Sequence, residues 1–507
     1  MSLRRILKLL GAFFMSQGVA TLSQLIVPPI FLHRYPHGVE MYGEWVALTA
    51  AVSYLTTLHG GIQTYANNQM TLHYNRGEVT EAKTVQSNAM RIMMMMALLA
   101  AGIGVAFLFM PVGRWMGLRF ISSRAAALTL FLFVLRLVAS WVFGFVANSY
   151  QVIGKLHRAA VWQNVQRLVA MLALAGFLWV RASFPVLAVT QLATVVLFIL
   201  LVVAELRLRA RVLLPSLRYG RLRDISAVLK PGGYYMLMSL GGFLCWQGPV
   251  LVIEKILGPA AVAVFALTRV VFNMSRQILI TMTYSISQET IDLVARRSWA
   301  QLRRIYDLSE RVVLLLDASI SVGVLLACPL ILNVWLHNGG LYQPGVCMLM
   351  AAVSAVMGIR EHKYMFQRQS NRHEEVAKVA FVVYLGMILA GALTIKVWGV
   401  EGYIACWLVA ELLIATYVIR QNRKLFPAEF LPSIAPLPRA VALLVVGFGA
   451  AAWPVWHDGS WPLLRVGAVA AAGTLVLLAV SYFVFGARAV QAVFEDRLRR
   501  RFALRQS

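Results

Sequence analysis

The chain has 507 residues, of which 60% are hydrophobic and 13% charged, and its mean hydropathy is +0.72. This composition excludes an ordinary soluble globular protein and predicts a chain that crosses a membrane many times. The net charge of +26 would suggest nucleic acid in a soluble protein. Here the basic residues fall between apolar runs, where membrane topology and anionic lipid explain them, so no nucleic-acid partner is expected. The four cysteines form no CxxC or Cys/His cluster, so neither a metal site nor a cofactor is predicted.

Fourteen apolar stretches are long enough to cross a bilayer. They are 9–32, 42–65, 88–110, 126–152, 159–180, 184–205, 230–256, 260–290, 309–335, 344–366, 377–397, 401–419, 439–456 and 462–485. The first apolar run is too long for a signal-peptide core and is expected to be retained. Of the 47 Lys and Arg residues, about 36 fall on one side, about 8 on the other, and three within spans. The positive-inside rule therefore predicts a multi-pass inner-membrane protein with both termini in the cytoplasm.

A repeated pattern predicts two six-helix halves. Tyr150-Gln151, Gly154 and His157 recur with the same spacing as Phe366-Gln367, Ser370 and His373, six spans later. An even number of spans per half implies parallel repeats. The domains predicted are 1–206, an N-terminal lobe; 207–229, a basic cytoplasmic linker; 230–425, a C-terminal lobe; 426–487, two additional helices; and 488–507, a basic tail.

The eighth span contains two arginines on one helix face. Arg269, Asn273 and Arg276 lie at i, i+4 and i+7, and Gln277, Tyr284 and Ser287 continue the stripe. A guanidinium left against lipid tails would cost several kcal/mol, so these side chains must face a protein interior or a wet cavity. One interpretation is a structural pair held by buried carboxylates or carbonyls. The interpretation that we favour is an anion site at membrane depth, to which Arg136 of the fourth span would contribute.

Other spans also carry polar stripes, for which hydrogen bonds between helices are the default explanation. The first span has Gln17 and Gln24, the second Gln63, and the seventh Tyr235. Acidic residues within the spans are few, which speaks against a carrier of cations. Asp317 is compatible with an arginine partner or with a proton or sodium site. No catalytic spacing of residues is found, so an enzyme is not expected.

Short motifs are spread along nearly the whole chain. They are Tyr42-Gly43, Leu58-His59-Gly60-Gly61, Asn75-Arg76-Gly77-Glu78, Gly258-Pro259-Ala260-Ala261-Val262, Phe265-Ala266-Leu267 and Gly399-Val400-Glu401-Gly402. Together they resemble the pattern of bacterial polysaccharide flippases, which belong to the multidrug/oligosaccharidyl-lipid/polysaccharide (MOP) exporter superfamily. The resemblance implies an all-α membrane fold with two six-helix lobes around a central cavity and two added helices. It also implies translocation of an undecaprenyl-diphosphate-linked oligosaccharide for O-antigen or exopolysaccharide synthesis. His59 stands where relatives commonly carry an acidic residue, so no cation-coupling role is carried over to it.

We therefore expect a lipid-linked oligosaccharide flippase that works by alternating access without covalent chemistry. The candidates for holding the diphosphate are Arg136, Arg269 and Arg276, because the guanidinium fork suits phosphate oxygens. The candidates for the sugar hydroxyls are Gln17, Gln24, Gln63, Tyr235 and Asn273. The partners expected are this lipid substrate, membrane lipids, and a polysaccharide polymerase with other assembly proteins. Alternatives are a flippase for the peptidoglycan lipid precursor, a drug or organic-cation antiporter of the same fold, and a membrane sugar polymerase or ligase. The short outer loops leave this last class little room for a catalytic surface.

Overall fold

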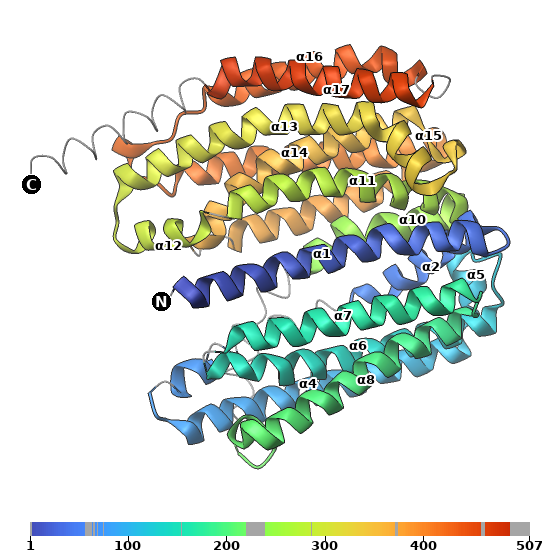
Figure 1. Cartoon of the computed structure of the whole chain (residues 1–507), viewed down its shortest axis with the longest axis vertical. Helices are drawn as coiled ribbons and strands as arrows, with labels where there is room; N and C mark the ends of the chain where they lie inside the picture. Colours follow the sequence, from blue (N-terminus) through green and yellow to red (C-terminus); the bar gives the residue numbers. More distant parts are fainter. Residues whose placement is uncertain are drawn as a thin grey trace, which may run out of the picture. The chain divides into compact units, whose positions relative to one another are not determined.

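The computed structural model describes residues 3–55, 63, 66–67, 69–74, 76–153, 155–219, 239–284, 286–370, 374–457 and 462–486. Side chains are described for all of these except 3–17, 20, 156, 288, 292 and 295. Within these ranges the regular structure is helical throughout (Figure 1). The prediction of an all-α membrane fold is confirmed.

Contacts divide the chain into two compact units, Met1–Ala263 and Val264–Ser507. The first unit contains α1 (Leu3–Arg34), α2 (Gly38–Ser53), α4 (Val79–Phe109), α5 (Val112–Met116), α6 (Ser123–Val152), α7 (Leu156–Trp179), α8 (Phe184–Arg209), η1 (Arg211–Leu213) and α10 (Gly248–Leu257). Helix α11 (Pro259–Tyr284) begins at the boundary, and the second unit continues with α12 (Ser287–Ala295), α13 (Trp299–Leu336), η3 (Gly339–Leu341), α14 (Pro344–Gln369), α15 (Glu374–Arg423), η4 (Ala428–Phe430), α16 (Pro436–His457), α17 (Leu463–Ser481) and η6 (Tyr482–Gly486). The boundary lies in the first turns of α11, and α10 belongs to the first unit because it packs on α2 and α5. The predicted domain limits stay a prediction.

Eleven helices of the described residues are long and apolar enough to cross a membrane. One of them, α15, has 50 residues, far more than the ~20 that a bilayer requires. It changes direction at Trp398 and Gly399, whose dihedral angles are not helical, and Gly399 has φ 58°. Glycine adopts a positive φ without a steric penalty. The bend separates the predicted spans 377–397 and 401–419, so α15 accounts for both of them.

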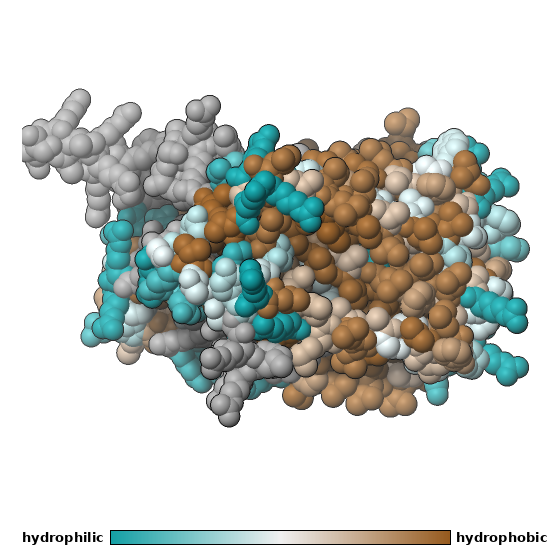
Figure 2. Space-filling model, turned by 90° about the horizontal axis from the view of Figure 1, so that it is seen from below, coloured by the Kyte–Doolittle hydropathy of each residue, from teal (hydrophilic) through white to brown (hydrophobic). Residues whose placement is uncertain are grey.

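The surface of the helices is apolar over most of their length. In Figure 2, hydrophobic residues cover the middle of the face in view, and hydrophilic residues gather toward the ends. Helix α8 contributes exposed Val189, Leu197 and Leu200, and α4 contributes exposed Leu98 and Leu99. Exposed apolar side chains of this number are expected where lipid, not water, is the solvent.

Aromatic packing holds four helices of the first unit together, α1, α2, α6 and α8. The Trp45 ring of α2 lies 5.1 Å from Phe133 of α6 and 5.3 Å from Phe184 of α8, and 5.8 Å from Phe31 of α1 (centroid distances). Beside this cluster, the buried Glu44 carboxylate accepts hydrogen bonds from the backbone N–H groups of residues 119, 120 and 121. Glu44 thereby satisfies three backbone donors of the loop between α5 and α6.

A segment that follows α8 is fastened along α4. The Lys83 ammonium donates to the carbonyl of residue 214 at 2.7 Å, and the Gln86 amide donates to that of residue 213 at 3.0 Å. The Ser87 hydroxyl donates to the carbonyl of residue 216 at 2.5 Å, and Arg91 donates to that of residue 217 at 2.7 Å. The 213–217 segment, which lies within the predicted linker, is thus bound to the first unit through its backbone.

Helices α16 and α17 pack on α13, as the upper layers of the second unit in Figure 1 show. Gly323 of α13 faces Thr474 of α17 so closely that a Cβ on the glycine would lie 2.3 Å from the threonine hydroxyl. Helix α16 is attached as well, because the Tyr342 hydroxyl donates to the carbonyl of Val455 in α16 at 2.7 Å. The two C-terminal helices therefore belong to the packed body of this unit.

The two units repeat the same succession of elements. In the first, α2, α4, the short α5, α6, α7 and α8 follow one another; in the second, α11, α13, the short η3, α14 and the two arms of α15 do. Residues with positive φ precede α2 and α11 (His37 and Gly258), and others lie between α7 and α8 and between the arms of α15 (Arg181 and Gly399). This order supports the duplication that the sequence motifs predict.

Candidate functional site

Helix α11 presents the predicted polar face while its opposite face is buried against α14. The Ser275 and Ser354 hydroxyls lie 3.2 Å apart, and Ser354 also donates to the carbonyl of Phe272 at 3.0 Å. Arg276 and Asn273 are only partly buried. The Arg276 guanidinium donates through Nε (3.2 Å) and Nη2 (2.7 Å) to Asn273 Oδ1. The side of α11 that packs on α14 is thus buried, whereas Asn273 and Arg276 lie on a side that stays partly exposed.

Arg269 lies two helical turns before Arg276 on the same face. Its guanidinium carbon lies 5.1 Å from the centre of the Phe265 ring, within the range of a cation–π contact. Like Arg276 it is partly buried. The structure thus places Arg269, Asn273 and Arg276 along one helix face, and their role in substrate binding stays a prediction.

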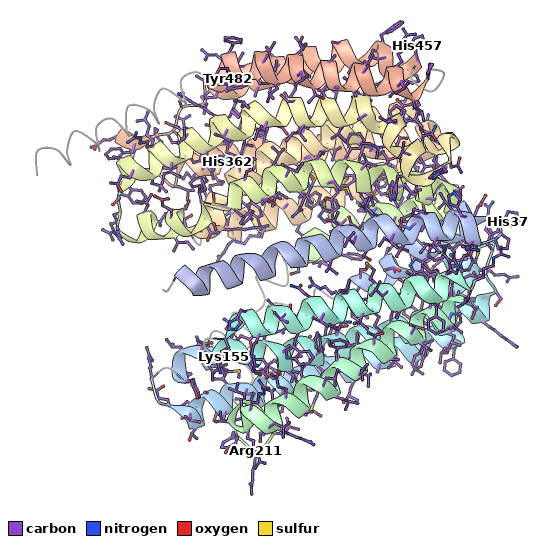
Figure 3. All side chains as sticks on the ribbon, viewed as in Figure 1. His37, Lys155, Arg211, His362, His457 and Tyr482 are labelled. Atoms are coloured by element: carbon purple, nitrogen blue, oxygen red, sulfur yellow. The ribbon has the colours of Figure 1, made fainter. Side chains whose placement is uncertain are left out.

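Helix α14 contains four successive ionisable residues that are all buried. Arg360 and Glu361 are 7% exposed, and His362 and Lys363 are 1% exposed. Successive residues of a helix point about 100° apart, so four buried neighbours mean that α14 is enclosed on every side at this level. Figure 3 marks the place of His362 within the second unit.

One part of this cluster is a closed ion-pair network between α14 and α15. Arg360 Nη1 lies 2.6 Å from Glu411 Oε2 and also donates to the Tyr384 hydroxyl at 2.5 Å. The Tyr384 hydroxyl in turn donates to Glu411 Oε1 at 2.9 Å, and the Trp407 indole donates to the same oxygen at 3.2 Å. A buried carboxylate with this many donors is well satisfied, which indicates a structural role.

A second part ties α14 to α13. Lys363 forms an ion pair with Glu310, and its ammonium lies 4.5 Å from the centre of the Tyr306 ring. His362 Nε2 and the Ser309 hydroxyl are 2.8 Å apart. Each of these contacts is between residues of two packed helices, so this part is also explained by the packing of the unit.

A further set of contacts lies on a partly exposed side of α14, after the four buried residues. Arg368 Nη1 donates to the hydroxyl of Tyr284, at the end of α11, at 2.7 Å. Its guanidinium carbon lies 4.2 Å from the centre of the Tyr364 ring. Asn273, Arg276, Tyr284, Tyr364 and Arg368 are all partly exposed, and we call this set the α11–α14 basic face. Two guanidinium groups with neighbouring hydroxyls are suited to an oxyanion such as a phosphate.

Glu361 is buried in α14 next to Arg360. Its Oε1 accepts from Arg360 Nη2 at 2.9 Å. Arg360 thus pairs with two carboxylates, Glu361 of its own helix and Glu411 of α15.

The remaining predicted site residues are spread over the first unit. Arg136 of α6 is partly buried, and no hydrogen bond or ion pair of its side chain involves another described residue. The Gln63 amide lies against Gly144 of α6, where a Cβ would approach its Nε2 to 3.0 Å. Gln24 is exposed on α1. The side chain of Gln17 and the whole of Tyr235 lie outside the described residues.

Asp317 of α13 was compatible with an arginine partner, and the structure shows a different environment. The side chain is 1% exposed, and its Oδ1 accepts from the Ser321 hydroxyl at 3.4 Å. Its Oδ2 has no hydrogen-bond partner among the described residues. No described arginine forms an ion pair with it. Among the described residues, no cluster of three or more His, Cys, Asp or Glu side chains is arranged to hold a metal.

Sequence reasoning missed Arg360, Glu361 and Arg368. The signal was present, because Arg360 to Lys363 lie inside the predicted tenth span 344–366. Because they lie near the predicted cytoplasmic end of this span, they resemble the basic residues that set membrane topology. The sequence alone therefore did not indicate them as site residues. A run of four ionisable residues before the end of an apolar span is unusual enough to be considered a site.

Comparison with solved structures identifies the architecture. The chain matches a lipid II flippase, MurJ, in an inward closed conformation with a TM-score of 0.67 and 11% identity, over 94% of this chain and 99% of that chain. It matches an inward-facing multidrug resistance MATE family transporter of the MOP superfamily with a TM-score of 0.64 and 12% identity, over 82% and 94% of the two chains. The chain has the fold of the MOP-superfamily transporters.

A third match belongs to the same superfamily. A MOP superfamily transporter from Pyrococcus furiosus, described as having a binding pocket of reverse polarity, matches with a TM-score of 0.54 and 12% identity, over 83% and 95% of the chains. At these identities the likeness shows the fold alone. No protein-family model matches the sequence, and no curated protein matches it.

Proposed function

We propose that the protein moves an undecaprenyl-diphosphate-linked oligosaccharide from the cytoplasmic to the periplasmic leaflet by alternating access, for the synthesis of a surface polysaccharide. The observation that carries this proposal is the α11–α14 basic face. It offers Arg276 and Arg368 together with the Tyr284 and Tyr364 hydroxyls at partly exposed positions. A diphosphate has oxygens for both guanidinium forks, and the hydroxyls and the Asn273 amide are suited to sugars.

The sequence motifs and the fold support the same class of substrate. A transporter requires no covalent chemistry, and a polyprenyl tail is able to stay in lipid while its polar head group is moved. Arg269 extends the basic face along α11, so that the head group meets more than one positive side chain on the way. Arg136 is a candidate from the first unit.

A flippase for the peptidoglycan lipid precursor is a second candidate, because the likeness to MurJ spans 94% of this chain. That precursor also has a diphosphate but carries a peptide on its sugars. The α11–α14 basic face does not distinguish the two substrates, since both present a diphosphate to it.

The experiment is a flipping assay in proteoliposomes with two substrates that share the polyprenyl diphosphate. One carries a neutral oligosaccharide and the other carries a sugar with the peptide. We expect the oligosaccharide substrate to become accessible to an enzyme added outside, and Arg276→Ala to abolish this. Exclusive transport of the peptide-bearing substrate would support the second candidate. Transport of neither substrate, together with export of an organic cation, would overturn both.

A further inference from the structure

Two of the four cysteines lie against each other inside the second unit. Cys328 of α13 and Cys347 of α14 place their Sγ atoms 3.5 Å apart, and both side chains are 0% exposed. The other two cysteines have different surroundings, because Cys406 Sγ lies 3.4 Å from the Thr394 hydroxyl and Cys245 belongs to the first unit. The fold thus brings together two sulfurs that are 19 residues apart in the chain.

The turn between α13 and α14 fixes the spacing of the two helices at this end. His337 ends α13 with φ 49°, and its N–H donates to the carbonyl of Asn333 at 2.7 Å. Asn338 Oδ1 then accepts from the N–H of Gly340 at 3.2 Å. A short turn with its own hydrogen bonds therefore holds α13 and α14 side by side where the two sulfurs meet.

Packing on both sides also holds the two sulfurs in this position. Gly345 of α14 lies so close to Glu401 of α15 that a Cβ on the glycine would overlap the carboxylate. Cys347, two positions further along the helix, points about 200° away from Gly345, and its sulfur meets α13. Leu332, on the same face of α13 as Cys328, is 1% exposed. The contact between the sulfurs is thus enclosed by packed helices.

Two neighbouring thiols have three uses, which are metal binding, apolar packing and a disulfide. Zinc takes four protein ligands in a structural site, and among the described residues no three His, Cys, Asp or Glu side chains are arranged to hold a metal. Apolar packing explains one buried cysteine but does not require a second sulfur opposite it. A disulfide requires the sulfurs at about 2.05 Å, so each has to move by only about 0.7 Å, which a rotation about its Cα–Cβ bond provides.

The predicted topology places this contact in an oxidising compartment. The ninth predicted span, 309–335, runs outward from the cytoplasm and the tenth, 344–366, runs back, so the turn between them is expected on the periplasmic side. Cys347 lies at the start of α14, and Cys328 lies about two turns before the end of α13. Disulfides form and persist in the bacterial periplasm but are rare in the cytosol. The geometry and the expected compartment therefore favour the same chemistry.

We infer that Cys328 and Cys347 form a disulfide that fastens α13 to α14. The inference rests on the predicted topology and is independent of the substrate. Each thiol loses its proton, and the two sulfurs lose two electrons and bond to each other. A disulfide of a periplasmic oxidase or of a low-molecular-weight compound takes up these electrons and protons and becomes two thiols.

The burial of the pair determines when the bond forms and what it does. Because both side chains are fully buried in the folded unit, oxidation has to precede the completion of packing, and burial then protects the bond from reductants. The bond keeps α13 and α14 together while the second unit moves as a body in the alternating access proposed above.

The test counts free thiols in the full-length protein as it exists in cells. Cells are quenched in acid, which protonates thiols and stops exchange, and the protein is denatured with a polyethylene glycol maleimide that adds mass at each free thiol. Since the chain has four cysteines, we expect two modified thiols without prior reduction and four after reduction. Proteolysis of the non-reduced protein should give a linked pair of peptides that contain Cys328 and Cys347.

Three variants assign the bond to this pair. Cys245→Ser/Cys406→Ser is the matched control that keeps the pair, and it should show no free thiol before reduction and two after. Cys328→Ser/Cys347→Ser should show two in both conditions. Cys328→Ser alone should leave its partner as a thiol and show three in both conditions. The count is made in denaturant, so these numbers do not depend on how well a variant folds.

Four free thiols in the wild type without reduction would overturn the inference and make the two cysteines ordinary buried side chains. A bond from either cysteine to another chain, or a bond between a different pair, would overturn it as well. The count involves no transport, so its failure leaves the proposed function in place, and failure of the flipping assay leaves the disulfide in place.

Discussion

The Arg360–Glu411 pair and the Arg276 side chain provide a direct test of which arginines are structural. Glu411 is fully buried and accepts from Arg360, Tyr384 and Trp407. Glu411→Gln removes the carboxylate charge and leaves the buried guanidinium paired with Glu361. Removing one partner of a buried ion pair costs about 3–5 kcal/mol, and we expect the lower end because Glu361 stays in place.

The expected change in melting temperature follows from this cost. At about 2–4 °C per kcal/mol, a loss of about 3 kcal/mol lowers Tm by roughly 6–12 °C. Arg276→Ala removes a partly exposed side chain whose described hydrogen bonds are to Asn273, so its Tm should stay within about 3 °C of the wild type. The assay is thermal unfolding of the purified protein in detergent, followed by tryptophan fluorescence.

One outcome for each variant would contradict these expected melting temperatures. A Glu411→Gln protein that melts with the wild type would show that the buried network contributes little to stability. An Arg276→Ala protein that melts as early as Glu411→Gln would make Arg276 structural, and the anion site would lose its main support.

Three further predictions concern transport and topology. Arg276→Lys should keep only part of the flipping activity, because an ammonium retains the charge but loses the bidentate fork; full activity would mean that charge alone suffices. Single cysteines at Gly220 and Ser370, in a cysteine-free background, should resist a membrane-impermeant thiol reagent in intact cells, while one at Gly459 should react; labelling of the first two would reverse the predicted topology. Flipping should be faster when the side from which the substrate enters is electrically negative, since moving two negative charges outward across 100 mV gains about 4–5 kcal/mol. Asp317→Asn should keep this response, and flipping that ignores the potential but stops when a proton or sodium gradient collapses would favour ion antiport.

The helices of this fold could be predicted from the sequence because lipid imposes one simple requirement, about 20 apolar residues per span. The bend of α15 at Gly399 also agrees with the predicted pair of spans. The polar face of α11 followed from helical periodicity, since Arg269, Asn273 and Arg276 share a face wherever the helix is placed. Each of these features depends on local sequence only.

The contacts of α14 could not be predicted in the same way. Whether Arg360 meets Glu411, and whether Lys363 meets Glu310, depends on how α13, α14 and α15 are rotated about their axes. Sequence spacing within one helix carries no information about that rotation. For the same reason Asp317 could not be assigned a partner, and the structure places a serine beside it.

The way in which α4 holds the 213–217 segment has a consequence for variation in the chain. The four hydrogen bonds all end on main-chain carbonyls, which every amino acid presents equally. The hydrogen-bonding specificity of this attachment therefore comes from the α4 side chains Lys83, Gln86, Ser87 and Arg91. Exposed Leu217, for example, should tolerate almost any replacement that keeps the backbone path. Substitutions on α4 that remove these hydrogen-bond donors should instead release the segment. A related protein could thus acquire a very different sequence after α8 and still have it fastened at the same place.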